Sequence, residues 1–169
     1  GFAAFSGTGK TTLLTQLVPR LRQRGLRIAM VKHAHHSFDV DKPGKDSYEL
    51  RKAGASQMLI ASARRWALVV ENETDAEPEL EALLHHIDQD RTDIILVEGF
   101  KHLPYPKIEL YREHVGHAPL YPNDPHVVAL VTDAVPPVAT DLPVLDINDS
   151  QTVADFITEE FLAHHHEGH

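Results

Sequence analysis

Apolar and polar residues occur along the chain in blocks that predict alternating strands and helices. Short, mostly apolar runs predict strands at residues 2–5 and 27–31, and four consecutive apolar residues at 94–97 are typical of a strand buried on both faces. Leucines and valines recurring every three or four positions predict an amphipathic helix over residues 11–24. Pro19 lies inside that helix, where it removes a backbone hydrogen bond, so a kink is expected.

The remaining pattern continues in the same way. Further helices are predicted over residues 47–53, 78–87 and 150–162, and further strands over residues 57–61, 66–70, 107–111, 127–131 and 143–145. The order favours an α/β fold with a mostly parallel twisted sheet and helices on both faces. The length of 169 residues favours one domain, 1–169, with residues 163–169 as a frayed tail.

The first apolar run leads into the sequence AAFSGTGKTTLL, which resembles the phosphate-binding pattern G-x-x-x-x-G-K-[ST]. Gly9, Lys10 and Thr11 match its end, whereas Ala4 stands where the first glycine would be. Alanine conflicts with the motif only if the backbone there needs a positive φ. A strand, a loop and a helix in succession favour a P-loop over a structural turn before a helix. The residues predicted to bind the nucleotide phosphates are Ser6, Gly7, Thr8, Gly9, Lys10, Thr11 and Thr12.

A P-loop enzyme also needs an acidic residue opposite the loop. The run at 94–97 ends in Glu98, like a Walker B strand, whose acid holds Mg²⁺ or its water. Lys10 and Glu98 are therefore the candidate catalytic residues, and Thr11 and Glu98 are candidate magnesium ligands. The alternative for Glu98 is a solvated residue at the end of a core strand.

The polar segment 33–46 allows three interpretations. It contains His33, His35 and His36 with Asp39, Asp41 and Asp46. It could contact a nucleotide or its Mg²⁺, hold a transition metal through imidazole and carboxylate, or be a solvated mobile loop. Lys42, Lys45 and Lys101 are further candidates for anion contact, and Arg64 and Arg65 fit an exposed hairpin tip.

Asp133 is a candidate for binding the base, because it follows a strand at the edge where bases bind in open sheets. A carboxylate there accepts hydrogen bonds from guanine. The stricter guanine signature Asn-Lys-x-Asp is absent.

Composition narrows the function classes. The net charge of −9 argues against nonspecific nucleic-acid binding. The absence of cysteine excludes disulfides and thiolate zinc sites, and agrees with a reducing, cytoplasmic location. No apolar run has the length of a membrane-spanning helix, so no membrane partner is expected.

Three segments together resemble the MobB family of molybdopterin-guanine dinucleotide biosynthesis proteins: SGTGKTT, VKHAHHSFDVDKPGKDSYELRKAGA and ILVEGFKH. The resemblance implies a P-loop protein that binds GTP and Mg²⁺, hydrolyses GTP weakly and forms a homodimer. It implies an adaptor role beside the guanylyltransferase MobA, which joins GMP to molybdopterin. It also implies that Asp46 and Glu98 belong to the magnesium region.

Two other classes fit parts of the sequence. A small-molecule kinase would use the same phosphate loop, but no arginine-rich lid insertion is visible. A GTP-dependent metal chaperone would use the histidine-rich segment, although cysteine and a long histidine tract are missing. Slow hydrolysis is expected because no evident arginine finger or water-orienting residue is present. We hypothesise that GTP and Mg²⁺ order the segment 33–47, which then presents a surface to the partner.

Overall fold

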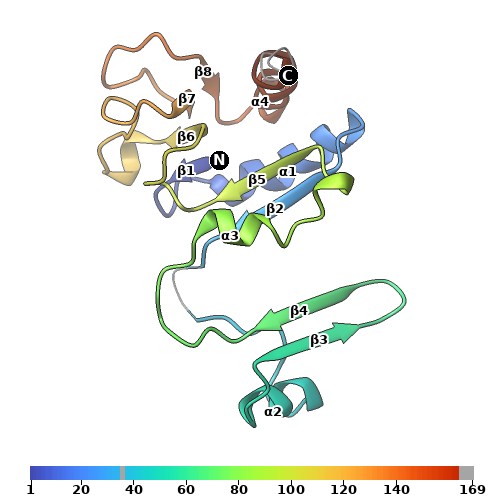
Figure 1. Cartoon of the computed structure of the whole chain (residues 1–169). Coiled ribbons are helices and arrows are strands. Elements are labelled where there is room, and N and C mark those ends of the chain that lie inside the picture. Colours follow the sequence, from blue (N-terminus) through green and yellow to red (C-terminus); the bar gives the residue numbers. More distant parts are fainter. Residues whose placement is uncertain (35–36, 164–169) are drawn as a thin grey trace. The chain divides into compact units, whose positions relative to one another are not determined.

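The computed structural model describes residues 1–34 and 37–163, which form two compact units (Figure 1). The first unit combines residues 1–33 with the chain from Leu80 onward, and the second contains residues 34–79. The sequence did not distinguish the second unit from the rest of the expected domain.

The first unit is built on a six-stranded sheet in which all neighbouring strands are parallel. Its order is β2-β5-β1-β6-β7-β8. The strands are β1 Phe2–Ala4, β2 Ile28–Lys32, β5 Ile94–Glu98, β6 Lys107–Tyr111, β7 Val127–Thr132 and β8 Val144–Asp146. Because the strands are parallel, the segments that follow β1, β2, β5, β6 and β7 all leave the same edge of the sheet. The mostly parallel α/β fold is therefore confirmed.

Helices pack on both faces of this sheet. Helix α1 (Lys10–Gln23) buries Leu13, Leu14, Leu17 and Leu21 against the strands and against α4 (Ser150–Asp155). The last helix continues as a π-helical segment over Phe156–Phe161. Helix α3 (Leu80–Leu84) buries Leu80 in a separate cluster with Val31 and Val97. It is shorter than the predicted 78–87, whereas α1 continues through Pro19 to Gln23.

Two three-residue 3₁₀ turns, Gln89–Arg91 and Glu113–Val115, complete the secondary structure of this unit. An apolar cavity of about 220 Å³ is lined by residues 94–97 of β5 together with Phe2 of β1 and Ile108 of β6. This cavity lies toward the amino ends of the strands, away from the glycine-rich loop.

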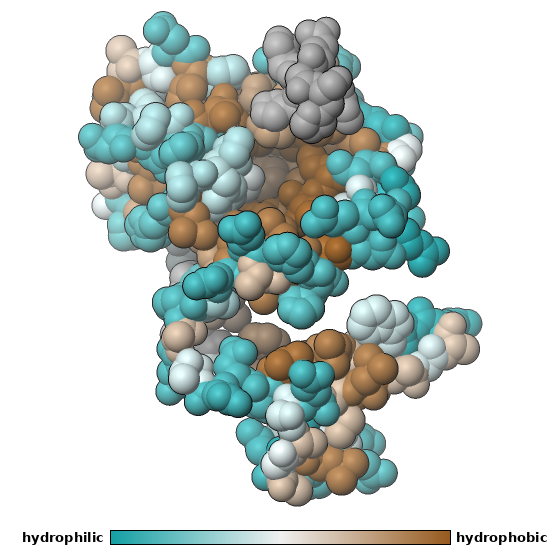
Figure 2. All heavy atoms as spheres, viewed as in Figure 1, coloured by the Kyte–Doolittle hydropathy of each residue, from teal (hydrophilic) through white to brown (hydrophobic). Residues whose placement is uncertain are grey.

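The second unit consists of helix α2 (Asp46–Lys52) and the antiparallel hairpin of β3 (Gln57–Ala61) and β4 (Trp66–Val70). Both strands match the predicted boundaries. The hairpin has large apolar side chains on its exposed face: Leu59, Trp66, Leu68 and Val70. Brown spheres gather over this hairpin in Figure 2. No helix within the described parts of the chain is long and apolar enough to cross a membrane.

Candidate functional site: the carboxyl edge of the sheet

The loop between β1 and α1 has the backbone conformation that its glycines predict. Gly7 and Gly9 have φ values of 83° and 96°, in the left-handed region that side-chain-bearing residues rarely adopt. Both the hydroxyl and the backbone N–H of Thr8 donate to the Phe5 carbonyl, which closes the turn. No side chain caps the first turn of α1, so its amides are available to an anion at the loop.

Ala4 does not disturb this loop. It is the last residue of β1 and pairs with Leu110 of β6. Phe100 is the only non-glycine residue with a positive φ in the described ranges, so Ala4 carries its methyl group without backbone strain. The missing first glycine therefore does not require a different loop conformation.

Lys10 and Glu98 come together, as the P-loop interpretation requires. Lys10 begins α1, and its Nζ lies 3.3 Å from Oε1 of Glu98 at the end of β5. Lys32 Nζ lies 3.6 Å from the same oxygen. The sequence analysis missed Lys32, although it ends β2, the neighbour of β5 in the parallel sheet. The Glu98 carboxylate is thus paired with two ammonium groups, next to the point where the glycine-rich loop ends and α1 begins.

The turn after β5 is tightly packed. Gly99 has a φ of 93°, and a Cβ atom there would lie 2.6 Å from the Cβ of His33. The backbone N–H of His33 donates to the Glu98 carbonyl, and its ring stacks on Phe100 with centroids 4.6 Å apart. His33 therefore packs against the turn that carries Glu98. His35 and His36 lie outside the described residues, and within the described ranges no three His, Cys, Asp or Glu side chains gather as a metal site.

Asp133 is connected to the phosphate loop through a residue that the sequence analysis missed, Arg112. Arg112 follows β6 directly; its Nε donates to the Thr8 carbonyl at 3.0 Å, and its Nη1 donates to Oδ2 of Asp133 at 2.6 Å. Only the strand order, which the sequence pattern does not contain, places the end of β6 between the ends of β1 and β7.

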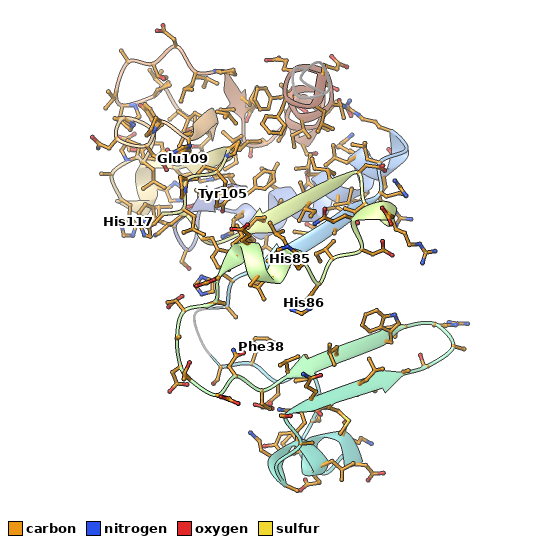
Figure 3. The ribbon with its side chains drawn as sticks, viewed as in Figure 1. Phe38, His85, His86, Tyr105, Glu109 and His117 are labelled. Atoms are coloured by element: carbon orange, nitrogen blue, oxygen red, sulfur yellow. The ribbon has the colours of Figure 1, made fainter. Side chains whose placement is uncertain are left out.

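Phe5 at the start of the loop has a cation on its ring and an aromatic partner. Lys101 Nζ lies 4.1 Å from the Phe5 ring centroid, and His117 stacks on the ring at 4.0 Å. His117 is among the side chains labelled in Figure 3. Lys101, a candidate for anion contact, therefore lies beside the loop that would hold the phosphates.

Two buried charged residues of β6 hold the surrounding segments. Lys107 Nζ donates to the carbonyls of Lys101 and Leu103 and to Asp124. Glu109 (Figure 3) accepts hydrogen bonds from the backbone N–H groups of Leu120 and Tyr121, while burial raises the pKa of its carboxyl. These contacts fix the segments on either side of β6.

In the second unit, Arg51 accounts for two of the three aspartates of the polar segment. Its buried guanidinium bonds Asp39, Asp41 and Glu71, and hydrogen bonding to Arg51 lowers the pKa of Asp41. Asp46 is not part of this cluster and begins α2. Because Asp46 belongs to the second unit, its role in holding Mg²⁺ stays a prediction.

Comparisons with known proteins agree on one family. The family model described as molybdopterin guanine dinucleotide synthesis protein B matches residues 1–133. A molybdopterin-guanine dinucleotide biosynthesis adapter protein from Escherichia coli is 52% identical over 159 residues, covering 94% of this chain and 90% of the relative. Its counterpart from Haemophilus influenzae is 43% identical over 166 residues, covering 98% of this chain and 90% of the relative.

Solved structures show the same fold. A MobB homologue from Bacillus stearothermophilus aligns with a TM-score of 0.73 at 20% identity, covering 96% of each chain. MobB from Bacillus subtilis aligns with a TM-score of 0.70 at 24% identity, covering 92% of this chain and 93% of the other.

Proposed function

The chain belongs to the MobB family, and from that premise we propose that it is a GTP-binding adapter in the synthesis of molybdopterin guanine dinucleotide. The observation that carries the nucleotide part is the glycine-bracketed loop at the start of α1, with Lys10 beside Glu98. The partner would be the guanylyltransferase MobA, which attaches GMP to molybdopterin. A cytoplasmic location is part of the same proposal.

The residues of the loop fit a nucleoside triphosphate. At Gly7 a side-chain carbon would meet nothing within 4 Å, so the loop is open to a ligand there. The amides of Ser6, Gly7 and Gly9 and of the first turn of α1 would bind the phosphates, with Thr8, Lys10 and Thr12 beside them. Asp133 would accept hydrogen bonds from guanine.

The metal donors fit Mg²⁺, which prefers oxygen ligands. The Thr11 hydroxyl and the Glu98 carboxylate would hold the ion directly or through water, and Asp46 is the third candidate. In the present structure Glu98 is paired with Lys10 and Lys32. Lys10 would therefore exchange Glu98 for phosphate when a nucleotide binds, leaving the carboxylate to the cation.

Weak hydrolysis agrees with an adapter role. Arg112, which contacts the loop, donates its hydrogen bonds to the Thr8 carbonyl and to Asp133, both of them protein groups. An arginine finger that stabilises transferring phosphate accelerates hydrolysis by about 10³–10⁵. We infer that GTP hydrolysis is slow and secondary to binding.

Homodimer formation is part of the proposal, with the β3–β4 hairpin as the contact between copies. The hairpin exposes 61% of Leu59 and 69% of Trp66, and contiguous exposed apolar surface commonly marks a contact with another protein. A second copy that covers this face would bury both. Trp66→Asp should shift the sedimentation coefficient to that of a monomer, whereas Val135→Asp, at an exposed valine of the first unit, should not. A wild-type monomer would contradict the dimer.

The adapter role is tested by adding the protein to a reconstituted reaction containing MobA, GTP, Mg²⁺ and molybdopterin. The wild type should raise the rate or yield of the dinucleotide product. Lys10→Ala should remove this gain, and Lys52→Ala, at an exposed lysine of α2, should keep it. A gain that is equal for the Lys10 variant and the wild type would show that nucleotide binding by this chain is not needed.

A further inference from the structure

Arg112 connects three adjacent strands at the carboxyl edge of the sheet. Strand β6 lies between β1 and β7, and Arg112 directly follows β6 (Figure 1). Its guanidinium reaches the Thr8 carbonyl, in the loop after β1, and the carboxylate of Asp133, which directly follows β7. One side chain therefore joins the loop predicted to bind phosphate to the carboxylate predicted to bind the base.

The geometry of the Arg112 contacts suits a fixed distance between the Thr8 carbonyl and the Asp133 carboxylate. Guanidinium is planar, and its N–H groups point in set directions, so the Nε bond to Thr8 and the Nη1 bond to Asp133 determine each other's position. The side chains of Arg112 and Asp133 are 24% and 29% exposed, so the pair is shielded from water on much of its surface. Lysine could not make both contacts through one planar group.

We propose that Arg112 is a positioning residue for base selection, which holds the Asp133 carboxylate at a set distance from the phosphate loop. The inference rests on the proposed binding of GTP and deepens it. Guanine presents N1–H and a 2-amino group to a carboxylate, whereas adenine presents the N1 lone pair and would be repelled. Discrimination therefore depends on where the carboxylate is held once the phosphates are fixed by the loop.

A different role for Arg112, as a cation that binds phosphate directly, makes other predictions. Loss of a phosphate contact would lower the affinities for GTP, ATP and pyrophosphate together. Loss of carboxylate positioning would lower the affinity for GTP and leave the affinities for pyrophosphate and ATP nearly unchanged. Arg112→Lys retains the charge but not the two-point contact, so it separates the roles.

The experiment is calorimetric titration of GTP, ATP and pyrophosphate, each with Mg²⁺, into the wild type and variants. Arg112→Ala and Arg112→Lys should each reduce the ratio of GTP to ATP affinity at least tenfold, with pyrophosphate affinity within twofold of the wild type. Arg22→Ala, at an exposed arginine of α1, should change neither. A urea unfolding curve for each variant establishes that it is folded at the titration temperature.

Variants of Asp133 provide a second test of the same proposal. Asp133→Asn should shift preference from GTP to XTP, because the asparagine amide can donate to the 2-oxo group of xanthine. Arg112→Ala should add little to the selectivity already lost in Asp133→Ala, since both changes act on one contact.

Equal losses for GTP, ATP and pyrophosphate in Arg112→Ala, or unchanged base preference in Asp133→Asn, would overturn the inference while leaving GTP binding in place. Absence of nucleotide binding by the wild type would instead overturn the proposed function, and this inference with it.

Discussion

Replacing Glu98 with glutamine should change nucleotide binding in opposite directions with and without Mg²⁺. Without the metal, Glu98 opposes binding because its Oε1 holds Lys10 at 3.3 Å and Lys32 at 3.6 Å, and because its charge repels phosphate. The side chains of Lys10 and Glu98 are only 19% and 15% exposed, so the pair is at the upper end of the range for surface ion pairs, about 1 kcal/mol. Glu98→Gln should release that energy, which corresponds to about a fivefold tighter affinity for GTP in EDTA.

With Mg²⁺ the same substitution removes a proposed metal ligand. GTP affinity should then fall, and the gain that the wild type obtains from Mg²⁺ should shrink. The assay is calorimetric titration of GTP in EDTA and in Mg²⁺, with Glu81→Gln, at an exposed glutamate of α3, as the control. A Glu98→Gln change of the same sign in both buffers would refute the reasoning that this carboxylate exchanges two lysines for a cation.

Three further predictions concern the loop and the framework. Ala4→Gly should leave GTP affinity within twofold of the wild type, measured by the same titration, because Ala4 already lies in an unstrained strand. Lys107→Met should lower the free energy of unfolding in urea by about 3 kcal/mol, since it leaves Asp124 without its buried partner. Hydrogen bonding to Arg27 lowers the pKa of Asp93 to about 2 from 3.8, so the stability from this contact is complete above the ordinary pKa and is lost as the pH falls toward 2. The wild type should therefore lose more stability than Asp93→Asn between pH 5 and pH 3, measured by urea midpoints; parallel losses would count against the contact.

Local patterns were sufficient to predict most strands and the main helix. The four leucines of α1 that follow a 3.6-residue spacing are all buried, and the apolar run of β5 ends at Glu98 as expected. The predicted 78–87 helix was too long because periodicity does not mark its ends, and only Leu80 of α3 is buried. The separation of residues 34–79 into a unit of its own depends on contacts that a pattern along the chain does not contain.

The candidate site shows the same limit. Motifs identified Lys10 and Glu98 because each lies within a short recognisable segment. Lys32 and Arg112 were missed because their partners are distant in sequence and become neighbours only through the strand order β2-β5-β1-β6-β7. Arg51 was likewise invisible, since its pairing with Asp39, Asp41 and Glu71 brings together residues from three segments. Polar contacts across parallel strands carry no spacing signal of their own.

The central claim is that the loop with Ala4 in place of glycine binds GTP, and calorimetry of GTP and ATP with Mg²⁺ tests it most directly. The wild type should bind GTP more tightly than ATP, and Lys10→Ala should lose GTP binding while remaining folded. A wild type that binds neither nucleotide, or binding that is indifferent to Lys10, would contradict the account and leave the loop as a structural turn before α1.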